Sequence, residues 1–246
     1  MKKPAIIAHR GSSAQAPENT LPAFQLAMRQ NADGIELDVH LTSDGIPVVI
    51  HDERIDRTGN GQGRIADQTL ETLKTYDFGI WKDSEFHGTR IPTLAEVLTL
   101  LDGWRGSLNI ELKTDVIQYP GIEEAVLKLV VDAGRLDWTH ISSFHHESLA
   151  ECRRLNKDIE LAALYDHHAV PDLPNLRRMG VTAIHPDVRD ATSWHVRRWH
   201  REGFRVRPYT VDPKLALLWQ ALCGVDAIIT NRPLESAAFL GRFFKD

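Results

Sequence analysis

Short runs rich in apolar residues recur along the chain, and longer stretches with the periodicity of amphipathic helices separate them. Such runs predict buried strands: Ala5–His9, Gly34–Leu41, Pro47–His51, Leu108–Lys113, His140–Ser143, Glu160–Leu164, Thr182–His185, Arg205–Tyr209 and Asp226–Thr230. The longer stretches predict helices at Leu21–Gln30, Leu94–Leu101, Ile122–Ala133, Glu147–Leu155, Leu173–Met179, Ser193–Glu202, Lys214–Leu222 and Leu234–Phe243. Strands that alternate with helices pair in parallel through right-handed crossovers, so the pattern indicates an α/β fold.

The number of strand–helix units favours a closed (β/α)8 TIM barrel. Such barrels typically need roughly 250 residues, and the chain has 246. An open doubly wound sheet is the alternative, because counting strands does not show closure. Neither a GxGxxG after the first strand nor a GxxxxGK[ST] is present, which disfavours the nucleotide-binding open sheets. We therefore expect residues 1–246 to form a single barrel domain.

One segment interrupts this alternation. Between His51 and the helix that begins near Leu94, the chain has five glycines and no long periodic pattern. A structureless loop of about forty residues is uncommon in a compact domain. We expect a small inserted subdomain at about residues 52–91, after the second strand region, that caps the barrel mouth.

The charge and the N-terminus narrow the class of protein. With 29 Lys and Arg against 34 Asp and Glu, the net charge is −5, which disfavours binding to nucleic acid or to an anionic membrane surface. The apolar run Ala5–Ala8 is too short for a signal peptide, and no window approaches the roughly 18 apolar residues of a membrane span. We expect a cytoplasmic protein without stable membrane association, whose anionic ligands would need a locally positive pocket.

Two of the predicted strands carry acidic residues on one face. Glu36 and Asp38 alternate with apolar residues, and Glu111 shares a face with Lys113 on a later strand. In a barrel this face points inward, where carboxylates are costly unless they are paired or bind a cation. Glu111 alone could pair with Lys113, but three inward acids predict a metal site. Oxygen ligands suit Mg²⁺ or Ca²⁺, and the pattern does not distinguish them.

His9 and His51 each end a predicted strand, and barrel active sites gather at the carboxyl ends of strands. Imidazole titrates near neutral pH, so one ring can remove a proton while the other donates one. Arg10 and Lys113 add positive charge suited to phosphate oxygens. Tyr209 ends a later strand and is a candidate substrate contact.

These residues belong to longer motifs that resemble the glycerophosphodiester phosphodiesterase family in order and spacing. Each motif alone is weak, but together they cover essentially the whole chain in the order of the family. The motifs are His9-Arg10-Gly11, Pro17–Thr20, Glu36-Leu37-Asp38, Asp44-Gly45, His51-Asp52, Arg57-Thr58 through Gly61, Ile91–Leu94, Glu111-Leu112-Lys113, Ser142–Phe144 and Tyr209–Val211.

The resemblance implies a barrel with an insertion after the second strand region. It also implies that the three acids bind a divalent metal, that the two histidines form the acid–base pair, and that Arg10 and Lys113 contact the phosphate. The family often has Trp in place of Tyr209, Asn in place of Asp212 and Asp in place of Asn231. These departures lie outside the acids and histidines.

The implied activity is metal-dependent hydrolysis of a glycerophosphodiester to glycerol 3-phosphate and an alcohol. The sequence does not decide which histidine is the base and which is the acid; we take His9 as the base and His51 as the acid, and the nucleophile is either water or the 2-hydroxyl of the substrate. Two alternatives are a related lysophospholipase D or phosphoinositide-cleaving phospholipase, and a non-catalytic phosphate-binding barrel. The head-group alcohol and the oligomeric state are open at this point.

Overall fold

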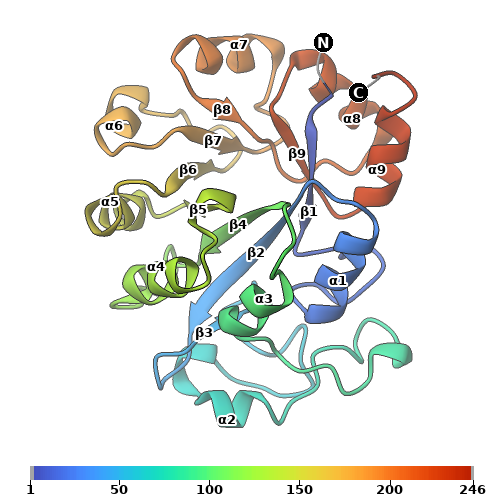
Figure 1. The fold of residues 1–246 in the computed structure, drawn as a ribbon, viewed down its shortest axis with the longest axis vertical. Coiled ribbons are helices and arrows are strands. Elements are labelled where there is room, and N and C mark those ends of the chain that lie inside the picture. Colours follow the sequence, from blue (N-terminus) through green and yellow to red (C-terminus); the bar gives the residue numbers. More distant parts are fainter. Residues whose placement is uncertain (1–2, 245–246) are drawn as a thin grey trace.

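The computed structural model describes residues 3–244. Within them, eight parallel strands form a nearly closed barrel (Figure 1), which confirms the predicted fold class. The strand order is β8-β7-β6-β5-β4-β2-β1-β9. The parallel strands are β1 (Ala5–His9), β2 (Gly34–Leu41), β4 (Ser107–Leu112), β5 (Thr139–Ser143), β6 (Glu160–Tyr165), β7 (Ala183–Pro186), β8 (Arg205–Val206) and β9 (Ala227–Thr230).

Backbone hydrogen bonds connect β8 and its continuation to β9, across the edges of the sheet. The N–H of Asp226 donates to the carbonyl of Val206 at 2.9 Å, and the N–H of Ile229 donates to that of Pro208 at 3.1 Å. The strand predicted at Arg205–Tyr209 is regular over only its first two residues, because Pro208 has no N–H to donate to a ladder.

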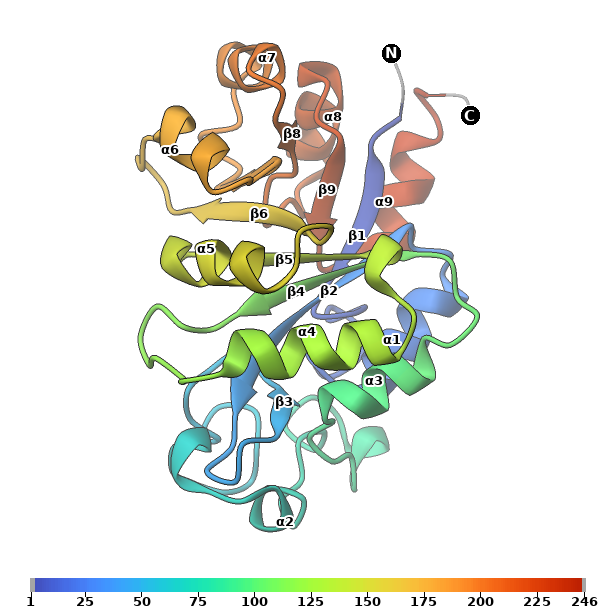
Figure 2. The ribbon, with the colours of Figure 1, turned by 60° about the vertical axis from the view of Figure 1, so that its left-hand side comes forward.

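Helices cover the outside of the barrel (Figures 1 and 2). Their apolar faces pack on the outward residues of the strands, such as Ile35 and Leu37 of β2, which are fully buried. Because successive side chains of a strand point to opposite faces, the polar residues that alternate with these apolar residues along β2 point into the barrel. The helices are α1 (Leu21–Arg29), α3 (Leu94–Leu100), α4 (Ile122–Asp132), α5 (His146–Leu155), α6 (Leu173–Arg178), α7 (Ser193–Arg201), α8 (Lys214–Cys223) and α9 (Pro233–Leu240).

The strand β3 (Pro47–Val49) is not part of the barrel wall. It pairs antiparallel with β2, with Val49 opposite Val39. The expectation that His51 ends a parallel barrel strand is therefore wrong. The turn after β2 sends the chain back along its own strand, and the N–H of Ile50 donates to the carbonyl of Asp38 at 3.1 Å. Because β3 runs back along β2, His51 comes close to the acids although it does not end a strand of the barrel wall.

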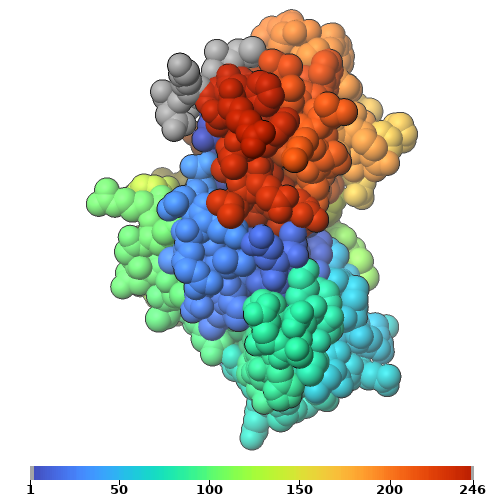
Figure 3. Space-filling model, turned by 90° about the vertical axis from the view of Figure 1, so that its right-hand side faces the viewer, coloured from blue at the N-terminus to red at the C-terminus, as the bar shows by residue number. Residues whose placement is uncertain are grey.

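The segment at residues 52–91 holds two 3₁₀ turns, Ile65–Asp67 and Ser84–Phe86, and the short helix α2 (Leu70–Leu73). It forms the lower end of the molecule, next to the N-terminal segment (Figure 3). That it behaves as a separate subdomain stays a prediction, although its apolar residues form, together with Val48 and Ile50 before it, a cluster distinct from the main core. The cluster is Val48, Ile50, Ile55, Ile65, Leu73, Phe78 and Ile91.

None of the helices within residues 3–244 is long and apolar enough to cross a membrane.

Candidate active site

Three acidic side chains meet inside the barrel near the carboxyl ends of its strands. Glu36 and Asp38 come from β2, and the parallel register places Asp38 opposite Glu111 of β4. The three offer carboxylate oxygens that all lie within 4.8 Å of one another. Glu36 is 3% exposed and Asp38 is 1% exposed. The structure thus brings together the three acids that the strand pattern singled out.

The mutual repulsion of these acids is visible in their pKa values. Burial and the charges of Asp38 and Glu111 raise the pKa of Glu36 well above its usual range. Burial and Asp38 raise the pKa of Glu111 to about 7. Burial also acts on Asp38, but the cation Arg10 beside it, with other positive charge, holds its pKa below the usual range. The three carboxyl groups therefore cannot all be charged at neutral pH without a further cation beside them.

One carboxylate oxygen of this cluster has no hydrogen-bond partner. Oδ1 of Asp38 is buried without one, and the nearest cation, Nζ of Lys113, is 3.9 Å away. An unsatisfied buried carboxylate oxygen is costly. A divalent cation bound by oxygen ligands would satisfy this atom and offset the repulsion among the acids. The residues present therefore fit a divalent metal.

Arg10 connects both acids of β2 to the loop before α1. Its backbone is left-handed, with φ of 56°, an uncommon conformation for a residue with a Cβ. In this conformation its N–H donates to Oε2 of Glu36 at 2.9 Å, while its Nε lies 3.3 Å from Oδ2 of Asp38. Its guanidinium also donates to Glu18 at 2.8 Å, and Asn19 donates to Oδ2 of Asp38 at 2.8 Å. The loop thus fixes the orientation of Asp38.

His9 ends β1 with one ring nitrogen towards the acids. Its Nε2 lies 3.9 Å from Oε2 of Glu36, and its Nδ1 lies 2.7 Å from Oδ1 of Asn231. Burial and the neighbouring Arg10 lower the pKa of His9 to about 4. The ring is therefore neutral at pH 7 and can accept a proton.

His51 approaches the acids from β3. Its Nδ1 lies 2.7 Å from Oδ1 of Asp52, and since a carboxylate only accepts, Nδ1 carries the proton. Its Nε2 lies 3.5 Å from Nζ of Lys113, which donates to Oε1 of Glu111 at 2.8 Å. Arg57 in turn donates to both Asp52 and the loop before α1.

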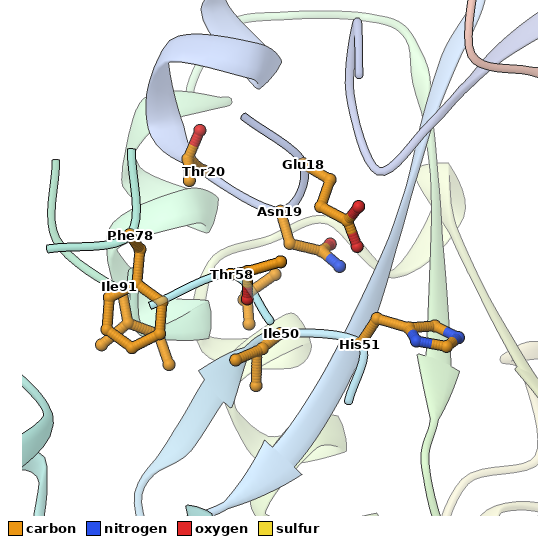
Figure 4. A pocket seen from close by; sticks show the side chains of 9 residues that line it. Glu18, Asn19, Thr20, Ile50, His51, Thr58, Phe78 and Ile91 are labelled. Carbon is orange, nitrogen blue, oxygen red and sulfur yellow. The ribbon is translucent and has the colours of Figure 1, made fainter. Parts of the chain in front are cut away.

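Polar side chains lie on one side of His51, and apolar side chains lie on the other. In Figure 4 the side chains of Glu18, Asn19 and His51 extend towards the same side, away from Phe78 and Ile91. The cavity between these segments measures only about 10 Å³, so the insertion packs closely behind His51.

Residues 9–235 match the glycerophosphoryl diester phosphodiesterase family. The chain belongs to this family. It is accordingly a phosphodiester hydrolase. A glycerophosphodiester phosphodiesterase from Caldanaerobacter subterraneus subsp. tengcongensis is 42% identical over 231 residues, which cover 94% of this chain and 95% of that protein. One from Bacillus altitudinis is 41% identical and covers 93% of this chain and 94% of its own length.

Solved structures of glycerophosphodiester phosphodiesterases and related proteins share the fold. A phosphodiesterase from Oleispira antarctica, in complex with the product sn-glycerol-3-phosphate, superposes with a TM-score of 0.87 at 30% identity and covers 96% of each chain. A glycerophosphoryl diester phosphodiesterase-like structure from Silicibacter pomeroyi superposes with a TM-score of 0.89 at 25% identity, covering 97% of this chain and 93% of that one.

Tyr209 follows β8, half-buried and already engaged. Its hydroxyl donates to the carbonyl of Tyr165 at 2.9 Å, and its ring packs edge-to-face with Phe144 at a centroid distance of 6.1 Å. Burial, together with the charges of Asp166 and Glu111, raises its pKa. A substrate contact at Tyr209 stays a prediction, and it would involve the ring or the oxygen of the hydroxyl as an acceptor, because the hydroxyl proton is already donated.

Several supporting residues were not predicted from the sequence. Asn19 lies in one of the family-like motifs, Pro17–Thr20, which was a signal without an assigned role. Asn231 stands in a stretch that reads as a helix start, yet Arg232 is the N-cap of α9 and no side-chain cap bond is present. The pairing of Ala8 with Thr230 in the β1–β9 register is what brings Asn231 beside His9.

Proposed function

We propose that this chain hydrolyses glycerophosphodiesters to glycerol 3-phosphate and an alcohol, with His9 and His51 as its acid–base pair. The observation that carries the proposal is the placement of both Nε2 atoms beside one buried acidic cluster, at 3.9 Å from Glu36 and 3.5 Å from Lys113. Family membership supports the reaction, and the Oleispira antarctica relative is described with the product sn-glycerol-3-phosphate.

Glu36, Asp38 and Glu111 would hold one divalent metal ion. Their all-oxygen donor set suits Mg²⁺ or Ca²⁺, and the unpartnered Oδ1 of Asp38 supports a cation here. When bound, the ion supplies positive charge that stabilises the negative charge developing on the phosphate in the transition state.

The side chains of the protein carry out the proton transfers and orient the phosphate. The neutral Nε2 of His9 removes a proton from the nucleophile, which is water or the 2-hydroxyl of the substrate; attack by the 2-hydroxyl would form a cyclic phosphate, which water then opens to glycerol 3-phosphate. His51 gives a proton to the leaving alkoxide, and the carboxylate of Asp52 stabilises the charged ring. Each proton transfer is typically worth about 10²–10⁴ in rate. Arg10 and Lys113 orient the phosphate through charge-assisted hydrogen bonds.

The site also has a lipid-substrate alternative. Ile80 and Trp81 in the insertion are 43% and 38% exposed, and exposed apolar groups near a site favour contact with acyl chains. Comparing turnover of glycerophosphocholine with that of lysophosphatidylcholine distinguishes the two substrates. We propose the water-soluble diester, because only these two large apolar side chains of the insertion are exposed.

The net charge bears on the partners of the enzyme. The net charge of −5 supports a small-molecule substrate over nucleic acid. We place the enzyme in the cytoplasm, and cell fractionation would test this.

Replacing the histidines tests the catalytic assignment. His9→Ala and His51→Ala should each abolish release of glycerol 3-phosphate from glycerophosphocholine, while binding of Mg²⁺ measured by calorimetry is nearly unchanged. His87→Ala is a matched control, because that side chain is 73% exposed on the insertion. Near-wild-type hydrolysis by either active-site variant would contradict the assignment.

A further inference from the structure

The carboxylate of Asp212 accepts hydrogen bonds from the residues at the end of β9. Its Oδ1 accepts hydrogen bonds from the hydroxyl of Thr230 and from the backbone N–H of Asn231, both at 2.9 Å. Its Oδ2 accepts from Nδ2 of Asn231 at 2.6 Å. Asp212 thus holds Asn231 both through its backbone N–H and through its side-chain amide.

These contacts determine which way the Asn231 amide faces. A carboxylate has no proton to donate, so the amide nitrogen has to face Asp212. Turning the amide over would set its oxygen against Oδ2 of Asp212. The oxygen Oδ1 of Asn231 therefore faces Nδ1 of His9, at 2.7 Å.

The orientation of the amide in turn determines the tautomer of His9. Because Oδ1 of Asn231 only accepts, Nδ1 of His9 has to carry the proton. The lone pair of the neutral ring is then on Nε2, the nitrogen that faces Glu36 at 3.9 Å. A hydrogen-bonded chain thus runs from Asp212 through Asn231 to His9.

The fold places the three residues of this hydrogen-bonded chain next to one another. The β1–β9 ladder pairs Ala8 with Thr230, so the next residues, His9 and Asn231, are neighbours at the ends of the two strands. The N–H of Val211 donates to the carbonyl of Ile229 at 2.9 Å, which places Asp212 beside the same strand end.

We propose that Asp212 and Asn231 are positioning residues that hold His9 in the Nδ1-protonated tautomer and aim its Nε2 at the nucleophile. This inference rests on the proposed function, in which His9 is the base. Neither residue contacts the reacting atoms in this arrangement. Their loss should therefore lower kcat and leave KM nearly unchanged.

An exchange of the two side chains separates this role from simple packing. In Asp212→Asn the amide of residue 231 can turn over and donate to Nδ1 of His9, which moves the ring proton to Nε2. In the double variant Asp212→Asn/Asn231→Asp, the new Asn keeps its oxygen towards Thr230 and donates its NH₂ to the new Asp. That Asp again accepts from Nδ1 of His9, so the double variant restores the chain.

The experiment measures kcat and KM for glycerophosphocholine with Mg²⁺, and the ¹⁵N chemical shifts of the His9 ring in metal-free protein. We expect Asp212→Asn to lose roughly 10²-fold in kcat, the lower end of a general-base contribution, and to shift the ring towards the Nε2-protonated form. The double variant should recover at least a tenth of the wild-type kcat and the Nδ1-protonated signature. Asp102→Asn, an exposed aspartate at the other end of the barrel, should match the wild type.

His9→Ala separates failure of this inference from failure of the proposed function. If His9→Ala is inactive but Asp212→Asn keeps wild-type kcat and tautomer, the positioning role is overturned and the base assignment stands. A double variant no more active than Asp212→Asn also overturns it. An active His9→Ala variant overturns the proposed base and the inference together.

Discussion

Nζ of Lys113 lies 3.5 Å from Nε2 of His51, so a lysine that follows a barrel strand meets a histidine that follows the antiparallel strand β3. Lys113 also donates to Glu111 at 2.8 Å and is only 7% exposed. Burial acts against its charge, but Glu111 and Asp38 raise its pKa above the usual range. Lys113 is therefore a fixed cation between the acids and one of the two proposed catalytic histidines.

Replacing this cation tests its role towards the phosphate. Lys113→Met should lower kcat/KM for glycerophosphocholine by about 10²–10³, the loss typical when a donor to transition-state charge is removed. Steady-state kinetics of glycerol 3-phosphate release provides the measurement. Lys128→Met is the control, since that side chain is 71% exposed on α4. A Lys113→Met enzyme within threefold of wild type would exclude a phosphate contact.

Removing the metal tests the acidic cluster. Treatment with EDTA should inactivate the enzyme, and Mg²⁺ or Ca²⁺ should restore activity, because only oxygen ligands are present. Asp38→Asn should abolish binding of the added ion in calorimetry, since Oδ1 of Asp38 is the unpartnered atom. Full activity after verified removal of metal would count against a metal site.

The stability of the fold should fall in mild acid because of two buried histidines, His140 and His185. Burial and the neighbouring Arg207 lower the pKa of both well below 6.5. In the unfolded chain they titrate near 6.5, so below that pH the unfolded state binds protons that the folded state does not. Their contribution is complete above pH 6.5 and is lost as the pH falls towards the folded pKa.

Urea unfolding at pH 7 and pH 5 measures this effect. His185→Gln, which cannot titrate in this range, should lose less free energy of unfolding between the two pH values than the wild type. His87→Gln, exposed on the insertion, serves as the control and should keep the wild-type difference. Equal losses for His185→Gln and wild type would show that the fold does not lower the pKa of His185.

The apolar cluster of the insertion should contribute measurably to stability. Phe78 is 3% exposed and packs within that cluster. Phe78→Ala should cost about 3–5 kcal/mol of unfolding free energy, as expected for a large buried aromatic. The measurement is urea unfolding followed by fluorescence. Phe243→Ala, at a 56% exposed position after α9, should cost under about 1 kcal/mol.

The strand pattern was sufficient for the fold class and for the acids. Alternation along β2 marks an inward polar face, and parallel pairing then brings Glu111 beside Asp38 without further information. The direction of the strand before His51 was not predictable, because an apolar run has the same appearance in parallel and antiparallel pairing. Asn231 was not identified either: closure of the predicted barrel makes the first and last strands neighbours, but the contact with His9 depends on the register of that pair.

The two proposed catalytic histidines belong to parts of the molecule with different support. His9 ends a strand that is paired on both sides, with β2 and β9. His51 follows an arm that pairs with β2 and continues into the insertion, whose apolar cluster includes Ile50. Changes in the length or composition of the insertion can therefore shift His51, the proposed proton donor, without moving His9, the proposed base. In this architecture the supports of the two histidines are separately adjustable, so that a change in the insertion would act on His51 before it acts on His9.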